Sequence, residues 1–272
     1  MAKTPSKSFW HKSRERWESS RSLVCLGLDS DTALLPDCVQ GSDNPIWDFN
    51  RRIIDATAEL VGAYKPNLAF YLADGTRGLE ALQRTLQYIP AEIPTILDCK
   101  SGDIGSTMEQ YCAAFFDQLG VDSITLNPLM GADVLKPVLK RGGAFAFALA
   151  LTSNPSAEDF FLAGGVDEQV AKWITQFPAD QLGAVVGATQ SADLRRMREL
   201  LPGRIFLIPG IGAQGGDLAS VLRYAVDSAD SPNILINSSR GIIFKDRSSD
   251  FAKAARHATA ELREQILQGL GA

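Results

Sequence analysis

A lysine stands between two aspartates in the segment TILDCKSGDIGST, residues 95–107. Asp98 lies two residues before Lys100, and Asp103 lies three residues after it. Two carboxylates beside one ammonium keep the lysine protonated, which suits a proton donor or a stabiliser of developing negative charge. A neutral amine nucleophile needs the opposite environment. A structural ion pair is the simpler explanation, but it needs only two of the three charges.

Two further segments have the composition of a phosphate site. The glycine-rich stretch IPGIGAQGGD, residues 208–217, follows one apolar run, and the segment NSSRGI with Arg240 ends the next. Glycines let backbone N–H groups approach an anion, and an arginine can donate two parallel hydrogen bonds to a phosphate. We expect a helix to begin near Asp217, which would add a favourable dipole. Glycines at such a turn often serve only the turn, so the pairing with Arg240 carries the prediction.

Eight short apolar segments, separated by amphipathic ones, must position these groups. Their continuous apolar character is typical of parallel strands covered on both faces. The segments span residues 22–30, 62–71, 95–102, 123–129, 144–153, 182–190, 204–212 and 233–241. A spacing of roughly 30 residues per unit indicates βαβ repetition. Eight such units predict an α/β chain with a closed (β/α)8 TIM barrel, as a single catalytic domain over residues 1–272. An open doubly wound sheet is the alternative.

The amphipathic segments predict the helices. Residues 191–201 carry one apolar stripe, with Ser191 as the expected N-cap. A leader helix that lies on the barrel is expected within residues 1–20, and a final helix over about residues 250–270. The longest interruption, residues 155–178, predicts an insertion that holds a short extra helix beside the barrel mouth.

Polar side chains stand where the predicted strands end. In a (β/α)8 barrel these carboxyl ends meet at one mouth, which is where the chemistry of such barrels takes place. Asp98 and Lys100 are two apart on a strand, so we expect them to point to the same face. Scattered surface polarity would not follow strand ends, and we expect polar groups from all eight strands to converge. These residues are Asp29, Lys65, Asp98, Lys100, Asn127, Thr152, Ser153, Thr189, Gln190, Arg240 and the glycines after residue 208.

Composition limits the class of protein. The chain has 272 residues and a formal net charge of −5. An acidic chain disfavours a broad nucleic-acid surface but allows one local anion site. No apolar run reaches the about 18 residues of a membrane span, and the N-terminus lacks the apolar core of a signal peptide. The four cysteines are scattered without a C-x-x-C pair, as expected for free thiols in the cytoplasm.

The segment DCKSGDIGST resembles the Asp-x-Lys-x-x-Asp signature of the orotidine 5′-phosphate decarboxylase family. The resemblance extends through most of the chain. GLDS is similar to the family's first-strand aspartate segment, AYKPNLAFY to its second-strand lysine segment, and LTSNPSA to its pyrimidine-binding turn. IPGIGAQGGD and SSRGI resemble its phosphate loop and phosphate arginine. The chain length and the TSNPSA segment are similar to the longer bacterial branch of the family.

The resemblance implies decarboxylation of orotidine 5′-monophosphate (OMP) to UMP and CO2, the last step of de novo pyrimidine nucleotide synthesis, with neither metal nor organic cofactor. Lys100 would stabilise and then protonate a ring carbanion, and Asp98 would lie against the departing carboxylate. Lys65 and Asp29 would complete the charge network and bind ribose hydroxyls. Further substrate contacts are implied for Ser153 and Asn154 at the pyrimidine edge, for Gln214, Ser239 and Arg240 at the phosphate, and for Pro209.

The resemblance also implies a homodimer with shared active sites. Asp103, with Ile104 and Thr107, would complete the site of the neighbouring subunit. This would explain the third charge of residues 95–107, because Asp103 follows the strand and need not enter the pocket of its own chain. The remaining expected partners are OMP and UMP alone, without nucleic acid or a membrane.

Two alternatives share the barrel. Magnesium-dependent sugar-phosphate decarboxylases or aldolases of the same superfamily carry a similar Asp-x-Lys-x-x-Asp motif. They need a further acidic ligand near the second strand, where this chain has Lys65. The other alternative is a non-catalytic barrel that binds a phosphate ligand, against which an intact charge network argues. The two histidines, His11 and His257, lie in the predicted leader and final helices, so histidine acid–base chemistry is not expected at the mouth.

Overall fold

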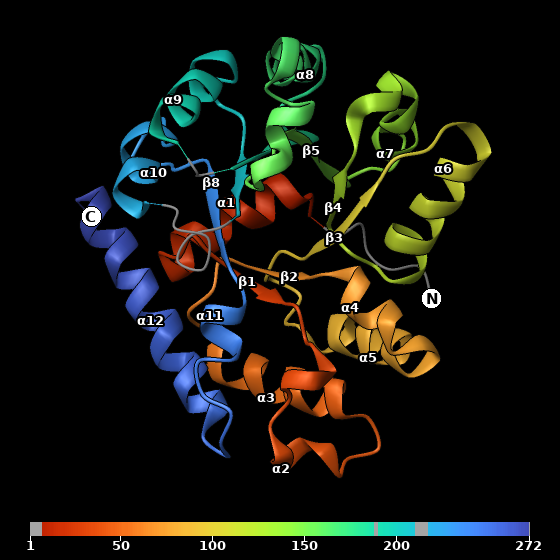
Figure 1. Cartoon of the computed structure of the whole chain (residues 1–272), viewed down its shortest axis with the longest axis vertical. Coiled ribbons are helices and arrows are strands. Elements are labelled where there is room, and N and C mark those ends of the chain that lie inside the picture. The colour runs from red at the N-terminus through yellow and green to blue at the C-terminus, as the bar shows by residue number, and fades with distance from the viewer. Residues whose placement is uncertain (1–6, 188–189, 210–216, 272) are drawn as a thin grey trace.

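Eight parallel strands form one sheet in the order β2-β1-β8-β7-β6-β5-β4-β3 (Figure 1). The computed structural model describes residues 7–187, 190–209 and 217–271. Two isolated parallel bridges, Tyr64 with Thr95 and Asn67 with Asp98, join β2 to β3 and close the barrel. The strands are β1 Val24–Leu28, β2 Ala63–Pro66, β3 Ile96–Ser101, β4 Ser123–Leu126, β5 Phe145–Leu151, β6 Leu182–Val186, β7 Phe206–Ile208 and β8 Ile234–Ser238. Each lies within its predicted range, and the predicted (β/α)8 barrel is confirmed.

Helices alternate with the strands and surround the barrel (Figure 1). The longer helices are α1 Phe9–Ser20, α3 Pro45–Thr57, α5 Gly75–Tyr88, α6 Gly105–Cys112, α8 Val166–Ile174, α9 Ser191–Leu200, α10 Leu218–Tyr224 and α12 Phe251–Leu270. The shorter helices and turns are η1 Thr32–Leu34, α2 Asp37–Gln40, α4 Leu68–Ala73, η2 Ala113–Gln118, η3 Pro128–Val134, α7 Lys136–Leu139, η4 Pro155–Asp159, η5 Ala163–Gly165 and α11 Arg240–Ile243. No helix among the described residues combines the length and apolar character needed to cross a membrane.

Capping residues explain where two strands end earlier than predicted. Asn67 accepts a hydrogen bond from the Ala69 N–H and begins α4, so β2 ends at Pro66. Asn127 does the same for η3 and ends β4. Ser191 was predicted to cap α9, but it is the first residue of that helix, and Gln190 occupies the cap position.

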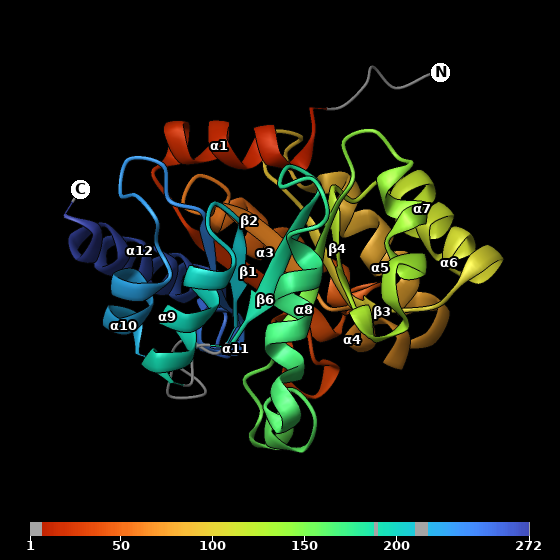
Figure 2. The same cartoon turned by 90° about the horizontal axis from the view of Figure 1, so that it is seen from above.

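The leader helix α1 covers the amino-terminal end of the barrel. Phe9 is fully buried, and its ring centroid lies 4.8 Å from that of Phe145 and 5.5 Å from that of Phe147. These two phenylalanines lie in the first half of β5 and belong to the apolar cluster that fills the barrel interior. Lys12 Nζ pairs with Asp122 Oδ2, just before β4, at 2.6 Å. Figure 2 shows α1 across one end of the barrel, so the opposite end is left for a site.

Residues 155–178 connect β5 to β6 and contain η4, η5 and α8. The first part of this segment projects at the end opposite α1 (Figure 2). Helix α8 contacts β5 and β6, so it is one of the barrel's own outer helices, and the additional elements are the two 3₁₀ turns. Arg196 of α9 pairs with the buried Asp167 at 2.6 Å and with Glu168 at 3.2 Å. These ion pairs attach the segment to its neighbouring helix.

Candidate active site

A cavity of about 290 Å³ opens where the strands end at their carboxyl termini. Side chains that point inward from the strands form its floor. One half of the floor is polar and the other is apolar, with Leu149, Val185 and Leu207 on the apolar side. The polar half contains Lys65, Asp98, Lys100, Thr125 and Asn237. A flat molecule with one polar and one apolar side would match this division.

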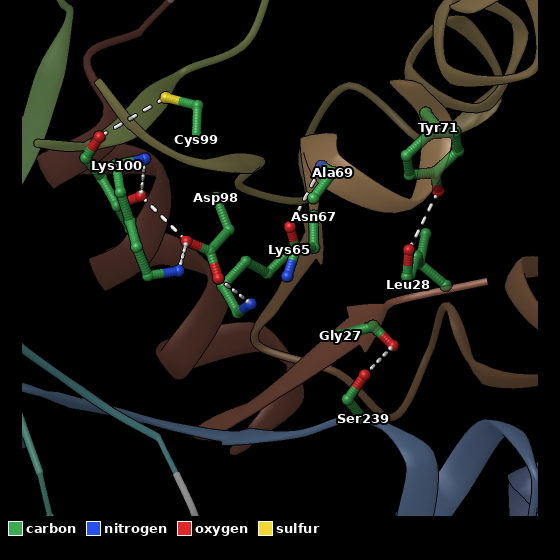
Figure 3. Close-up of polar contacts among 11 residues, drawn as sticks. Gly27, Leu28, Lys65, Asn67, Ala69, Tyr71, Asp98, Cys99, Lys100 and Ser239 are labelled. Carbon is green, nitrogen blue, oxygen red and sulfur yellow. Dashed lines mark hydrogen bonds and ion pairs between the residues drawn. The ribbon is translucent and has the colours of Figure 1, made fainter. Parts of the chain in front are cut away.

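Asp98 is the centre of the polar half (Figure 3). Lys65 Nζ lies 2.8 Å from its Oδ2, and Lys100 Nζ lies 2.6 Å from its Oδ1. The side chain of Lys65 is 4% exposed, whereas that of Lys100 is 52% exposed. One lysine is therefore enclosed in the barrel, and the other is the cation that a ligand in the cavity would meet.

Both members of the buried pair are held in their charged forms. Burial alone would raise the pKa of Asp98, but the ion pairs with Lys65 and Lys100 outweigh burial and lower that pKa below its ordinary value. Burial alone would lower the pKa of Lys65, but the carboxylates of Asp98 and Asp29 outweigh it and raise that pKa above its ordinary value. The floor therefore carries fixed charges.

We expect the Asp98–Lys65 pair to stay charged from about pH 4 to about pH 10, inside the ordinary values of 3.8 and 10.5. The folded-state pKa of Asp98 is depressed, so its stabilisation is present above the unfolded pKa and is lost as the pH falls through the folded one. The folded-state pKa of Lys65 is raised, so its stabilisation is present below the unfolded pKa and is lost as the pH rises through the folded one. Carboxyl ¹³C NMR of Asp98 should show no titration above pH 4, and a midpoint above pH 4 would contradict the assignment.

Lys100 reaches Asp98 from an irregular stretch of β3. Leu97 pairs with Ile124 and Ser101 with Leu126, so residues 98–100 of β3 face a single residue of β4. Lys100 has φ 47°, in the left-handed region that costs a non-glycine residue about 1–2 kcal/mol. The two side chains do meet, but the regular two-residue alternation from which this was predicted is wrong for β3. Non-glycine residues in this conformation often lie at functional sites.

Asp103, Ile104 and Thr107 lie outside the cavity of their own chain. Asp103 Oδ1 accepts a hydrogen bond from the Ile104 N–H at 2.8 Å. No ion pair within the described parts of the chain joins Asp103 to Lys100, whereas Asp98 pairs with both lysines. The three charges of residues 95–107 therefore do not form one cluster within a single chain.

The rim carries the candidate anion-binding groups. Arg240 begins α11 directly after β8, is exposed at the cavity, and makes no ion pair with any residue that the structure describes. Ser239 Oγ donates a hydrogen bond to the Gly27 carbonyl at 3.2 Å (Figure 3). A Cβ on Gly27 would lie 2.7 Å from the Cβ of Ser239, so only glycine lets β8 end this close to β1. Arg240 is thus a cation at a tightly packed strand end, without an ion pair to the residues that the structure describes.

Some of the other residues predicted to contact a ligand line the cavity, and the rest lie outside the residues that the structure describes. Ser153 and Asn154 follow β5 and line the cavity, as does Pro209 after β7. Gln214 and the glycines of residues 210–216 lie outside the described residues. Helix α10 does begin after Asp217, whose carboxylate accepts from the Ala219 and Ser220 N–H groups at its N-terminus.

The prediction that every strand end contributes a polar group to one mouth holds only in part. Asn127 caps η3 and does not line the cavity. Among the described residues, β6 and β7 contribute the apolar side chains of Val185 and Leu207. Thr189, predicted at the end of β6, lies outside the described residues. The polar side of the cavity therefore comes from β1 to β5 and from β8.

Two polar residues of the floor were missed from the sequence. Thr125 of β4 donates to Asp98 Oδ1 and accepts from the Lys100 N–H, both at 2.9 Å. Asn237 of β8 is 9% exposed, and its Oδ1 is buried without a hydrogen-bond partner in the described chain, as is Asp29 Oδ1. Both missed residues are the last but one of their strand, but they fall inside the longer ranges that the sequence predicted for these strands, residues 123–129 and 233–241. A polar residue inside an apolar run was the available signal.

Within the described ranges, no three His, Cys, Asp or Glu side chains gather as metal ligands would. The fold and its mouth define a (β/α)8 barrel with a charged floor and an exposed arginine, Arg240, at its rim. The model of the orotidine 5′-phosphate decarboxylase / HUMPS family matches residues 22–257. The chain belongs to this family.

Curated relatives and a solved structure are similar to this chain over nearly its whole length. The orotidine 5′-phosphate decarboxylase of Bacteroides fragilis is 41% identical over 95% of this chain and 97% of its own length. That of Herpetosiphon aurantiacus is 44% identical over 91% of this chain and 94% of its own length. The solved structure of Leishmania donovani OMP decarboxylase superposes with a TM-score of 0.83 at 33% identity, covering 97% of this chain and 99% of that one. The similarity therefore includes every strand of the barrel.

Proposed function

We propose that this protein decarboxylates OMP to UMP and CO2, the last step of de novo pyrimidine nucleotide synthesis. The observation that carries the proposal is the Lys65–Asp98–Lys100 network on the floor of a cavity with Arg240 at its rim. The names of the relatives support the same reaction. The spread of charge from floor to rim fits a ligand with a reacting carboxylate at one end and a phosphate at the other.

Fixed charge would supply the catalysis. Loss of CO2 from a ring without an electron sink leaves the electron pair of the broken bond on the ring carbon. Such reactions need their barrier lowered by on the order of 20 kcal/mol. Lys100 Nζ would stabilise that electron pair and donate a proton to the same carbon, while Asp98 lies against the departing carboxylate. The resulting neutral amine of Lys100 regains a proton from solvent. Because Asp98 and Lys65 are already oriented, little reorganisation accompanies the step.

The rest of the cavity would orient the nucleotide. Ser153 and Asn154 would contact the pyrimidine edge, above the apolar half of the floor. Asp29 Oδ1 and Asn237 Oδ1 are buried acceptors that need donors, and ribose hydroxyls would supply them, with Lys65 beside Asp29. The phosphate contacts would come from Arg240, Gln214, Pro209 and the backbone of Ser239. These phosphate contacts lie far from the reacting carbon. In many enzymes, binding energy from such remote contacts helps to stabilise the transition state.

Replacing Arg240 should separate phosphate binding from the chemistry. We expect Arg240→Ala to lower kcat/KM for OMP by at least ~30-fold, the loss of about 2 kcal/mol or more from a charge-paired contact. The phosphate-free substrate orotidine should lose less than about threefold. Arg247→Ala, an exposed arginine of the following loop, is the matched control and should match the wild type. Equal losses on both substrates would place the phosphate elsewhere.

We infer that the enzyme is a homodimer with shared active sites. Asp103, Ile104 and Thr107 do not line the cavity of their own chain, and exposed apolar side chains lie beside them, at Ile104 and in η3, which contacts α6. Ile104, Leu129 and Met130 are 53%, 61% and 56% exposed. A contiguous patch of exposed apolar side chains is typical of an interaction surface. A two-fold interface here would bury them and bring Asp103 to Lys100 of the partner chain.

We also propose a cellular location and a set of partners for the enzyme. We place it in the cytoplasm, where free thiols persist, and Cys25, Cys38, Cys99 and Cys112 are all free in the structure. Its proposed partners are OMP, UMP and a second copy of the chain, with neither nucleic acid nor a membrane.

Two substrates distinguish the proposal from the magnesium-dependent sugar-phosphate enzymes. That alternative needs an acidic ligand near β2, where Lys65 is instead buried in an ion pair with Asp98. Labelled CO2 release should be measured from carboxyl-labelled OMP and from 3-keto-gulonate 6-phosphate, with magnesium present. We expect release from OMP alone. Release only from the sugar phosphate would contradict the proposal and favour a magnesium-dependent decarboxylase. Release from neither substrate would also contradict it and would favour an aldolase or a non-catalytic barrel.

A further inference from the structure

Thr125 connects two members of the charge network through one hydroxyl. Its Oγ1 donates to Asp98 Oδ1 and accepts from the Lys100 N–H, both at 2.9 Å. The residue lies on β4, is 2% exposed, and lines the floor of the cavity. A hydroxyl can donate and accept at the same time, so only serine or threonine could make both contacts from this position.

The backbone of Lys100 needs such a partner. Residues 98–100 bulge against the single residue Thr125 of β4, and Lys100 has a left-handed φ of 47°. The Lys100 N–H therefore bonds to a side chain where a regular ladder would use a backbone carbonyl. The same Asp98 Oδ1 that accepts from Thr125 also pairs with Lys100 Nζ. The hydroxyl thus contacts both ends of the Asp98–Lys100 unit.

We propose that Thr125 is a positioning residue that holds Lys100 in its left-handed conformation and so fixes the place of the Lys100 ammonium. This inference rests on the proposed function, because it specifies how the same site is built. The role assigned to Thr125 acts through Lys100 and requires no contact between the Thr125 hydroxyl and the reacting carbon. A displacement of about 1 Å in a reacting group can cost about 100-fold in rate, so losing the hydroxyl should affect the chemical step.

Three substitutions test the role of the hydroxyl. Thr125→Val keeps the shape and removes both hydrogen bonds, and it should lower kcat for OMP at least ~10-fold with KM within about threefold of wild type. Thr125→Ser keeps the hydroxyl and should retain kcat within about threefold. Thr259→Val removes another fully buried threonine hydroxyl, in α12 and remote from the cavity, and should leave kcat unchanged.

Hydrogen exchange gives a readout that does not depend on activity. The Lys100 N–H should exchange with solvent at least ~10-fold faster in Thr125→Val than in the wild type or in Thr125→Ser, because its acceptor is gone. NMR of the backbone amides measures this directly. If the wild type does not decarboxylate OMP, the proposed function fails, and the exchange rates still decide whether Thr125 holds Lys100.

Several results would overturn the inference. These are a folded Thr125→Val with more than half of the wild-type kcat, a Thr125→Ser as impaired as Thr125→Val, and unchanged exchange at Lys100. If Thr125→Val does not fold, Thr125→Ala takes its place with the same expected losses. If neither variant folds, the hydroxyl serves folding and not the position of Lys100, and the inference is wrong.

Discussion

Lys100→Ala is expected to lower turnover of OMP by several orders of magnitude while nucleotide binding remains measurable. Lys100 is the exposed cation of the floor, 2.6 Å from Asp98, and its removal leaves the new electron pair without a stabilising charge or a proton donor. Rim contacts such as Arg240 remain, so UMP should still bind. Turnover by single-turnover kinetics and UMP affinity by calorimetry give the two quantities separately.

The control for this variant is Lys136→Ala. Lys136 is an exposed lysine of α7 that pairs only with Asp133 among the described residues, and its loss should not change turnover. If Lys100→Ala kept more than about a tenth of wild-type turnover, it would have lost less than about 1.4 kcal/mol of barrier lowering. Lys100 could not then be the group that stabilises and protonates the ring carbon.

Mixing two inactive variants should restore activity if the sites are shared. Lys100→Ala and Asp103→Ala subunits, exchanged at random, form mixed dimers. In one site of such a dimer, the Asp103→Ala chain supplies Lys100 and the Lys100→Ala chain supplies Asp103, so this site is intact. The other site carries both defects. Half of the dimers are mixed and each has one intact site of two, so activity should approach about one quarter of wild type per site.

A second mixture controls for non-specific recovery. Asp98 and Lys100 pair within one chain, so Lys100→Ala mixed with Asp98→Ala leaves a defect in every site and should stay inactive. No recovery in the first mixture, with subunit exchange confirmed by mass spectrometry, would show that Asp103 does not act in the partner's site. Recovery in the second mixture would mean that the sites are not assembled as proposed.

The barrel could be predicted because its strands are buried on both faces. Such strands appear as continuous apolar runs, and all eight were found at their observed places. Their ends were less predictable, since Asn67 and Asn127 begin short helices by capping them. A leader helix that lies on the barrel was expected, but the insertion of its Phe9 into the barrel interior was not. That Phe9 fills the amino-terminal end of the barrel depends on a cavity formed by distant residues such as Phe145.

The site was predictable where residues carry chemistry at strand ends. Asp98, Lys65 and Lys100 meet in the structure as expected. The left-handed conformation of Lys100 was not predictable, because strand periodicity assumes a regular backbone. Thr125 and Asn237 were missed for a related reason. Whether a polar residue inside a strand faces the cavity or a helix depends on register, which the chain acquires only when the barrel closes.

The absorbance of OMP, followed after adding purified protein with and without prior EDTA treatment, tests the charge-based mechanism most directly. Fixed charges of Lys100, Asp98 and Lys65 need no metal, so the absorbance should fall at the same rate in both samples. An absorbance that did not fall at all would contradict the proposed decarboxylation. A reaction that EDTA stopped and added magnesium restored would contradict the metal-free mechanism.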